Sequence, residues 1–325
     1  MGLSWEVGKG GASTRCSRGP RGRVERSEAF TSALRRGGAT TMSAYLDSAA
    51  RAHAQLFSDL PLAEAYRLSS AEAERRGLPK VSKEMDLTYG DVPFEALRQI
   101  IHAANPRPGT LFYDLGSGCG RGVIAAALIH EFDCCVGIEV LSDLHGAAVE
   151  PARRYETLRS ATPAELNAHR LGPCVFLNAD LFNVNLADDA NGRRQRRQEE
   201  DQTPAPDKAA SLEVDHRDVL VFACCVTWND DLLERLAAKL AVELPTCSFV
   251  LTVGKRLPAV VDLPPGPTGQ DQGAVRFEER WRGAGAFEWG SELLYAHECV
   301  RLGVLAARRH RKAAGSGSSA KQTRS

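Results

Sequence analysis

The 325-residue sequence has no net charge, no long apolar run and no paired-cysteine motif. Lys plus Arg number 41 and Asp plus Glu number 41, so the chain as a whole exerts no electrostatic pull on nucleic acid, and any basic footprint must be local. No stretch approaches the roughly 18 uninterrupted apolar residues of a membrane helix, and the N-terminus lacks the apolar core of a secretory signal. These absences predict a soluble, intracellular protein.

The nine cysteines form no CxxC motif and no Cys/His ligand spacing. Neither a zinc site nor a disulfide framework is therefore expected, and no metal is predicted. Most of the cysteines stand in apolar runs, where a free thiol behaves as a small hydrophobe. The adjacent pair Cys224 and Cys225 has apolar flanks and no histidine beside it in sequence, which argues against a nucleophilic role.

Both ends of the chain differ in composition from the middle. Residues 1–41 are basic and rich in glycine without apolar periodicity, which predicts a disordered leader. Glu6, Glu25 and Glu28 argue against a transit peptide, and Met42 is an equally good start of the protein. Residues 306–325 are basic and contain Gly and Ser, so a disordered tail is expected. One domain is predicted over 42–305.

This domain is predicted to be an α/β fold with an N-terminal helical cap. Apolar residues recur at helical spacing within 42–80, and Pro61 can open a second helix of the cap. Short apolar strands then alternate with helices, which is typical of a parallel sheet; they fall at 110–115, 134–140, 174–177, 219–223 and 248–253. Segments 274–281 and 292–300 predict a C-terminal antiparallel hairpin. The polar stretch 187–217 is interpreted as a loop insertion.

The strongest local signal is the sequence FYDLGSGCGR at 112–121, in which a strand ends in an acid and turns through glycines into a helix. Only glycine lets a backbone turn this tightly against a ligand, so a nucleotide-like cofactor is predicted. Residues 120–125 also match the GxGxxG/A dinucleotide pattern, with Glu139 about 20 residues further on. That match starts too far into the helix, so NAD is the weaker alternative.

Two acids follow the next strands and suit a nucleoside. Glu139 ends the second strand, where a carboxylate can accept hydrogen bonds from both hydroxyls of a ribose. Asp180 follows the third strand and can accept from an adenine amino group, although an Asp in this position also commonly forms an Asx turn. Its neighbour Leu181 is a candidate for covering the adenine face.

A family resemblance adds to this interpretation. The GxGxG glycines after Asp114 resemble the first motif of class I S-adenosylmethionine (SAM)-dependent methyltransferases. The segment YGDVPF at 89–94, the glycine motif and Glu139 resemble, in order, the Dot-type (disruptor of telomeric silencing) histone lysine methyltransferases over roughly 81–253. The resemblance implies a class I methyltransferase (Rossmann-like) sheet, SAM as the cofactor, and a lysine of histone H3 in the nucleosome as the acceptor.

The resemblance also implies roles for particular residues. It implies that Tyr89, Gly90 and Asp91 close over the methionine part of SAM. The other cofactor-binding candidates are Asp114, Gly116, Ser117, Gly118, Gly120, Glu139, Asp180 and Leu181. In this family the fourth strand ends in an Asn-Asn-Phe-Ala-Phe type segment beside the methyl group, and the matching residues 224–228 read CCVTW, without either asparagine. The catalytic candidates are Tyr89, Cys224, Thr227 and Trp228, with Trp281, Trp289 and Tyr295 as candidates for the substrate mouth.

The predicted function is therefore SAM-dependent N-methylation of a protein lysine, on a histone in the nucleus. Alternatives are a class I methyltransferase that acts on a non-histone protein or a small molecule, in the nucleus or the cytoplasm, and a SAM-binding module without catalysis. The missing asparagines motivate the alternative of a SAM-binding module without catalysis. The basic residues at 308–312 are candidates for DNA contact or a nuclear import signal, because clustered cations displace counterions from phosphates.

Overall fold

The computed structural model describes residues 39–77, 87–161, 166, 169–200 and 219–318. Residues 1–38 of the predicted disordered leader (1–41) lie outside the described residues, whereas 39–41 are helical and belong to α2. The helices of the described part are α2 (Ala39–Leu56), α3 (Leu62–Arg75), α4 (Phe94–Ala104), α5 (Arg121–Ile129), α6 (Ser142–Ala161), α7 (Leu186–Glu200), α8 (Asp230–Glu243) and α9 (Val304–Ser318). None of these helices has the length and apolarity needed to cross a membrane.

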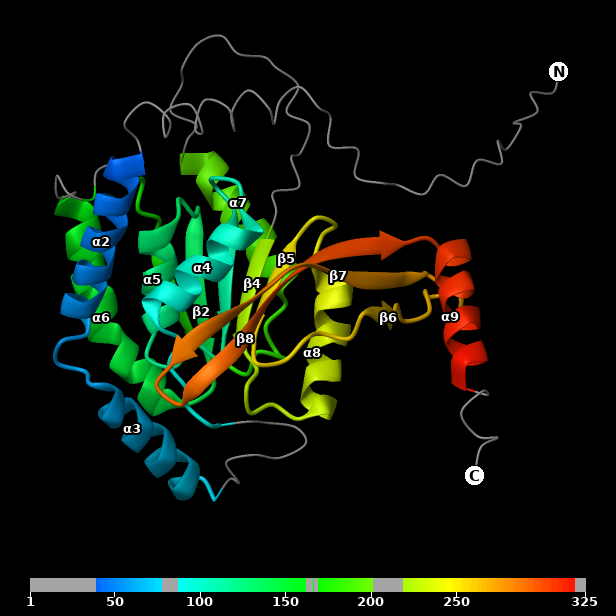
Figure 1. The fold of residues 1–325 in the computed structure, drawn as a ribbon, viewed down its shortest axis with the longest axis horizontal. Helices are drawn as coiled ribbons and strands as arrows, with labels where there is room; N and C mark the ends of the chain where they lie inside the picture. The colour runs from blue at the N-terminus through cyan, green and yellow to red at the C-terminus, as the bar shows by residue number, and fades with distance from the viewer. Residues whose placement is uncertain (1–38, 78–86, 162–165, 167–168, 201–218, 319–325) are drawn as a thin grey trace, which may run out of the picture.

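One eight-stranded sheet, with the order β3-β2-β1-β4-β5-β8-β7-β6, forms the centre of the fold (Figure 1). Its strands are β1 (Leu111–Leu115), β2 (Cys134–Glu139), β3 (Cys174–Asn178), β4 (Val219–Cys224), β5 (Phe249–Val253), β6 (Val260–Asp262), β7 (Ala274–Phe287) and β8 (Gly290–Leu302). β1 to β5 pair in parallel, whereas β8, β7 and β6 are antiparallel. The predicted parallel sheet with a C-terminal hairpin is confirmed, and β6 is an addition that the sequence did not indicate.

Helices cover both faces of the parallel strands, which explains why those strands are apolar throughout instead of alternating. α2, α4, α5 and α6 contribute to one core cluster, together with Phe112 and Phe222 from the sheet. α7 and α8 contribute to the opposite cluster, together with Tyr113 and Val221. The strand order reverses between β1 and β4, and in such sheets ligands bind in the crevice outside the carboxyl ends of the strands.

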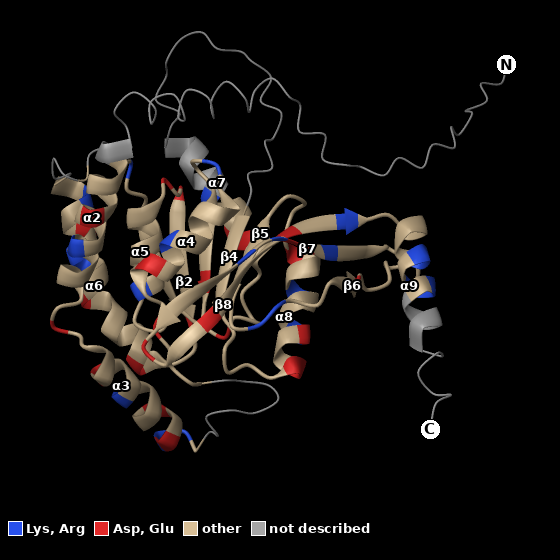
Figure 2. Ribbon diagram, in the orientation of Figure 1, with Lys and Arg blue, Asp and Glu red and all other residues tan. Residues whose placement is uncertain are grey.

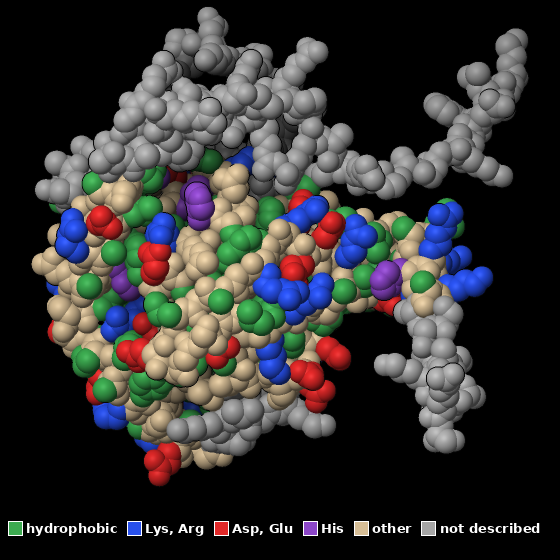
Figure 3. Space-filling model, viewed as in Figure 1, with side chains coloured by type: hydrophobic (Ala, Val, Ile, Leu, Met, Phe, Trp, Pro, Cys, Tyr) green, Lys and Arg blue, Asp and Glu red, His purple; other side chains and the backbone are tan. Residues whose placement is uncertain are grey.

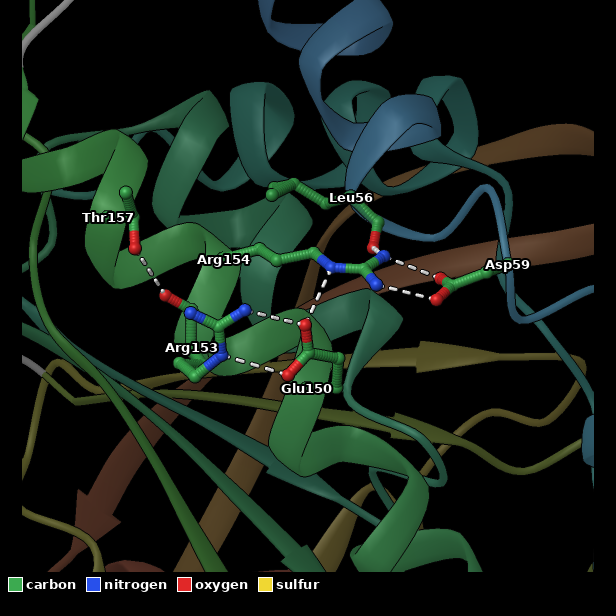
Figure 4. Close-up of polar contacts among 6 residues, drawn as sticks. All are labelled: Leu56, Asp59, Glu150, Arg153, Arg154 and Thr157. Atoms are coloured by element: carbon green, nitrogen blue, oxygen red, sulfur yellow. Dashed lines mark hydrogen bonds and ion pairs between the residues drawn. The ribbon is translucent and has the colours of Figure 1, made fainter.

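The helical cap is anchored to the body by α6. Arg154 of α6 donates to both carboxylate oxygens of Asp59, at 2.5 Å each, and to the carbonyl of Leu56 (Figure 4). On its other side, Arg154 contacts Glu150 at 3.0 Å. The guanidinium fork matches a carboxylate in this bidentate way, so the pair fixes the direction in which the chain leaves α2.

A second link places α3 beside the sheet. The Glu72 side chain is 2% exposed, and it accepts hydrogen bonds from the backbone N–H groups of Ser142 (2.9 Å) and Asp143 (2.7 Å). These are amides of the first turn of α6, which have no partner within the helix. A carboxylate there also favours the positive end of the helix dipole. α3 therefore caps α6 from outside.

Two segments expected to be disordered or loop-like are helical where they are described. Residues 187–200 of the predicted loop insertion belong to α7, since the buried hydroxyl of Tyr113 donates to Asp189 at 2.8 Å and Leu186 is buried. Residues 306–318 of the predicted disordered tail belong to α9, where Arg311 pairs with Asp262 at 2.9 Å and with Asp271 at 3.1 Å. Composition missed both because the partners lie far away in sequence.

The spacing of cysteines in the sequence predicts only local motifs, such as CxxC. Seven of the described cysteines are free thiols: Cys119, Cys134, Cys135, Cys174, Cys224, Cys225 and Cys299. Cys247 is disulfide-bonded, which the absence of a cysteine motif did not predict.

The cap on α6 makes a prediction for stability. Glu72→Ala leaves the two first-turn amides of α6 without this acceptor, so we expect the free energy of unfolding to fall by about 1–2 kcal/mol. Chemical denaturation measures it. Glu74→Ala, on the exposed face of the same helix, is the matched control with an expected change within about 0.5 kcal/mol. Equal losses for the two variants would contradict the capping role.

Candidate active site

A cavity of about 430 Å³ lies at the carboxyl ends of β1, β2 and β4. Nine of the predicted site residues line it: Tyr89, Gly90, Gly116, Glu139, Asp180, Leu181, Cys224, Thr227 and Trp228. The other five, Asp91, Asp114, Ser117, Gly118 and Gly120, are not among its lining residues. Most of the predicted site residues therefore line one cavity, and the other five do not reach its surface.

The glycine turn after β1 lies directly against neighbouring rings. Gly118 has a φ of +54°, and a Cβ there would lie 2.4 Å from the Tyr89 ring. Gly120 has a φ of +83°, and a Cβ there would lie 2.5 Å from the Phe176 ring. Both the left-handed backbone and the close contact require glycine. Gly120 of the alternative dinucleotide pattern is the N-cap of α5 and residues 121–125 lie inside the helix, so the pattern does not form a phosphate loop.

Glu139 connects this turn to the end of β2. Its carboxylate accepts from the Gly118 N–H at 2.7 Å and from the Leu141 N–H at 2.8 Å. Burial raises the pKa of Glu139, and these two backbone hydrogen bonds oppose the increase. Each carboxylate oxygen can accept a second hydrogen bond. Because Glu139 also lines the cavity, it is suitably placed to accept from ribose hydroxyls.

Asp114 lies behind the wall, against the first turn of α5. A Cβ added to Gly122 would meet its Oδ2 at 2.5 Å, so glycine at this helical position makes room for the carboxyl group. Burial raises the pKa of Asp114 to about 8, and the charges of Glu139 and Asp91 act in the same direction. Burial also raises the pKa of Asp91 to about 6. These three acids make the region favourable for a cation.

The loop 87–91 covers the cavity and is held by three neighbours. Ser69 of α3 donates to the Leu87 carbonyl at 2.8 Å. The Tyr89 hydroxyl lies 3.1 Å from Cys119 Sγ, within hydrogen-bond distance. The Gly90 backbone lies under Trp289, because a Cβ there would be 3.3 Å from the indole ring. The loop 87–91 is therefore held by the cap, the glycine turn and the β7–β8 hairpin, and its closure over SAM stays a prediction.

The end of β4 forms the remaining wall. Cys224 lines the cavity, whereas Cys225 is fully buried in the core, with its Sγ directed to the Ala223 carbonyl at 3.6 Å. Thr227 is exposed, and Trp228 is 7% exposed, so the indole contributes to the core as well as to the cavity wall. Of the two positions that lack the family's asparagines, only the first lines the cavity.

Among the three hairpin aromatics, Trp289 lines the cavity, and its Nε1 donates to Glu292 at 3.2 Å. Trp281 packs against the core, and Tyr295 is buried beneath Arg282. Sequence reasoning missed Tyr66, whose ring meets Tyr89 edge-on at 5.4 Å. Nothing in the pattern of α3 sets that tyrosine apart from core residues.

Asp180 forms the Asx turn and lines the cavity, and its contact with an adenine amino group stays a prediction. Its Oδ1 accepts from the Phe182 N–H at 2.9 Å, which is an Asx turn, and the residue also lines the cavity beside Leu181. All four residues of the segment 179–182 line the cavity.

The sheet order, the glycine turn and the acids at the strand ends define a Rossmann-like class I methyltransferase fold. Residues 70–170 match the family model described as "Histone methylation protein DOT1". The match confirms the resemblance seen in the sequence and identifies SAM as the cofactor. Together with the cavity it supports a SAM-dependent methyltransferase. No curated protein matches the chain.

Solved structures with similar folds include TrmN from Thermus thermophilus, at 14% identity and a TM-score of 0.36, covering 65% of this chain and 49% of that one. The chain thus spans about half the length of TrmN.

A putative RNA methyltransferase, PH1948 from Pyrococcus horikoshii, is 11% identical with a TM-score of 0.38, covering 71% of this chain and 98% of that one. Haemonchus contortus phosphoethanolamine N-methyltransferase 1, in complex with phosphoethanolamine and S-adenosylhomocysteine, is 12% identical with a TM-score of 0.36, covering 64% and 43%.

The pKa of Asp114 predicts that SAM binding releases a proton. Below about pH 8 the carboxyl group of the ligand-free protein is protonated, and a bound cation favours its ionised form. Calorimetric titration at pH 7 in buffers of different ionisation enthalpy measures this release. We expect Asp114→Asn to abolish most of the release and to weaken SAM binding. A wild-type binding enthalpy that does not depend on the buffer would contradict the assignment.

The raised pKa of Asp114 also predicts an effect on stability. Asp114→Asn should weaken SAM binding but stabilise the ligand-free fold at high pH. A carboxyl group whose pKa is raised in the folded state stabilises the fold at low pH, and this contribution is lost as the pH rises from about 4 to about 8. Asp114→Asn removes that loss, so we expect the ligand-free variant to melt about 2 °C or more above the wild type at pH 8. The two melting temperatures should converge near pH 4.

Proposed function

We propose that this protein transfers a methyl group from SAM to the amino group of a protein lysine, and that the acceptor is histone H3 in the nucleosome. The histone part rests on the DOT1 match over 70–170. A nuclear location and nucleosomes as partners follow from that acceptor. The lysine part rests on the chemistry of the cavity.

The observation that carries the proposal is the absence of any cation from the residues that line the cavity. None of these described residues is Lys, Arg or His, whereas Glu139 and Asp180 are acidic. Near the end of β4, the charges of Asp114, Glu292 and Asp91 add to burial in raising the pKa of Cys224 to about 12. A negative, aromatic cavity attracts a cationic amine and repels a phosphate. A nucleotide acceptor is therefore disfavoured.

Aromatic side chains at the cavity suit the stem of a lysine. Tyr66, Tyr89 and Trp289 come together there from α3, the covering loop and the hairpin. Flat rings contact methylene groups well, and their faces attract an ammonium group. A long side chain with an apolar stem and a cationic end fits this combination better than a small polar metabolite does.

The reaction requires little acid–base catalysis from the protein. Bound SAM supplies an electrophilic methyl group on a sulfonium. The side chains at the end of β4, Cys224, Thr227 and Trp228, contribute to the wall where the acceptor would approach, and the covering loop with Tyr89 excludes water. Positioning and desolvation of this kind suffice for an in-line displacement by a neutral amine.

The basic helix α9 supports only a modest contact with nucleosomal DNA. Its cations lie at the far end of the β7–β8 hairpin (Figure 2), and Arg309 and Lys312 are exposed. Arg308 and Arg311, by contrast, pair with Asp271. On the face shown in Figure 3, basic and acidic side chains are interspersed along the hairpin. We propose α9 as an auxiliary DNA contact and not as the main determinant of binding.

Transfer of labelled methyl from SAM tests the acceptor. Purified protein is offered intact nucleosomes, free core histones and a mixed extract in parallel. We expect label on H3 in nucleosomes. Label confined to the extract would contradict the histone acceptor and favour a non-histone protein or a small molecule, and SAM binding without label on any acceptor would favour the non-catalytic module. Mass spectrometry of the labelled peptide identifies the lysine.

The two adjacent cysteines provide a matched pair of variants. Because Cys224 lines the cavity and Cys225 does not, we expect Cys224→Ala to lower the methyl-transfer rate by about tenfold with little change in SAM affinity. Cys225→Ala should instead leave the rate of the folded protein close to wild type and reduce stability by about 1 kcal/mol. Transfer rates, SAM titration and thermal unfolding separate the two effects. The reverse pattern would refute the assignment of this wall to the acceptor.

A further inference from the structure

One face of α8 lies along the chain segment 179–186, which connects β3 to α7. Arg235, Lys239 and Glu243 stand four residues apart on α8, so their side chains share one face of the helix. Exposure alternates along the segment, and the even-numbered residues from 182 to 186 are less exposed than the odd-numbered residues between them. The three α8 side chains, called the α8 stripe below, contact these even-numbered residues in order.

Lys239 is the centre of this contact. Its Nζ donates to the Val184 carbonyl at 2.5 Å and to the two carboxylate oxygens of Glu243, at 2.6 and 2.8 Å. Glu243 Oε2 also accepts from the N–H of Leu186, the first residue of α7, at 2.9 Å. The Lys239 side chain is only 7% exposed, and an ammonium group has three donors. All three therefore have acceptors, which a charge this deeply buried requires.

Arg235 contacts the same segment one helical turn earlier. Its guanidinium lies 4.1 Å from the centre of the Phe182 ring, as a cation–π contact. Phe182 lines the cavity, and its N–H donates to Asp180 Oδ1. The α8 stripe thus holds the segment on both sides of the Asx turn's last residue, and this turn contains the acid that the sequence predicts for the adenine amino group.

We infer that the α8 stripe, with Lys239 as its positioning residue, holds Asp180 against the base of SAM and thereby makes the cavity selective for a 6-aminopurine over a 6-oxopurine. A carboxylate accepts from the amino group of adenine, whereas a 6-oxopurine places a second acceptor there. The discrimination depends on where the carboxylate is held, because hydrogen bonds weaken steeply with misalignment. The inference rests on the proposed function only in that SAM occupies the cavity, and it requires no particular acceptor.

Two ligands that differ at the 6-position of the purine test this role. Calorimetry on the full chain gives the dissociation constants of S-adenosylhomocysteine and of S-inosylhomocysteine, in which a 6-oxo group replaces the 6-amino group. Neither carries the sulfonium charge, so the buried acids act alike on both. We expect the wild type to bind the adenosyl compound about tenfold or more tightly than the inosyl compound, and Lys239→Met to reduce this ratio to about threefold or less.

Lys255→Met is the matched control. Lys255 pairs with Asp230 at the first residue of α8, at 3.1 Å, outside the α8 stripe, so this variant should keep the wild-type ratio. A general loss of stability weakens both ligands alike. An unchanged ratio in folded Lys239→Met, or an equal reduction in Lys255→Met, would therefore overturn the inference, as would a wild type without preference for the adenosyl compound.

A second variant serves if Lys239→Met does not fold. Arg235 is exposed, so Arg235→Ala removes the contact with Phe182 without opening the core. We expect it to lower the ratio about threefold, and an unchanged ratio would overturn the inference.

The comparison measures cofactor binding and not methyl transfer. A protein that binds S-adenosylhomocysteine but labels no histone would therefore contradict the proposed acceptor and leave this inference intact. A wild type that binds neither compound would overturn both.

Discussion

The arrangement of this protein depends on carboxylates buried at the carboxyl ends of two parallel strands. Asp114 is the penultimate residue of β1 and Glu139 is the last residue of β2. Because β1 and β2 pair in parallel, the two acids lie near the same edge of the sheet on adjacent strands. Burying charge of one sign in one region is unfavourable, and the raised pKa values of both groups express this cost. A cationic ligand relieves it. The buried acids therefore favour binding of the cationic SAM, apart from any contact that the protein makes with its adenine.

Parts of the cap and of the hairpin converge on this charged region. Glu72 caps α6, and Ser69 holds the start of the loop 87–91. The hairpin adds Trp289 above Gly90. Segments that are far apart in sequence thus line one cavity. Burial raises the pKa values of Asp114 and Glu139, and a bound cation favours their ionised forms.

Sequence reasoning succeeded where local chemistry determines the outcome. The glycine turn needs left-handed residues at Gly118 and Gly120, and the sequence shows glycine at both. It failed where the partner is distant. α7 is held by Tyr113, and α9 is held by Asp262 and Asp271, so neither helix follows from its own polar composition. Tyr66 escaped notice for the same reason, because only the tertiary fold brings α3 to the cavity.

The loss of the two family asparagines is less consequential than the sequence suggests. Cys225 lies in the core, where a thiol needs fewer hydrogen-bond partners than an amide would. The change at the cavity is therefore confined to Cys224. Burial and the surrounding acids keep its thiol protonated, so it presents a neutral, polarisable surface to the acceptor in place of an amide. Under the proposed function, the wall of Cys224, Thr227 and Trp228 would position the acceptor amine through its shape, whereas an asparagine would add a hydrogen bond.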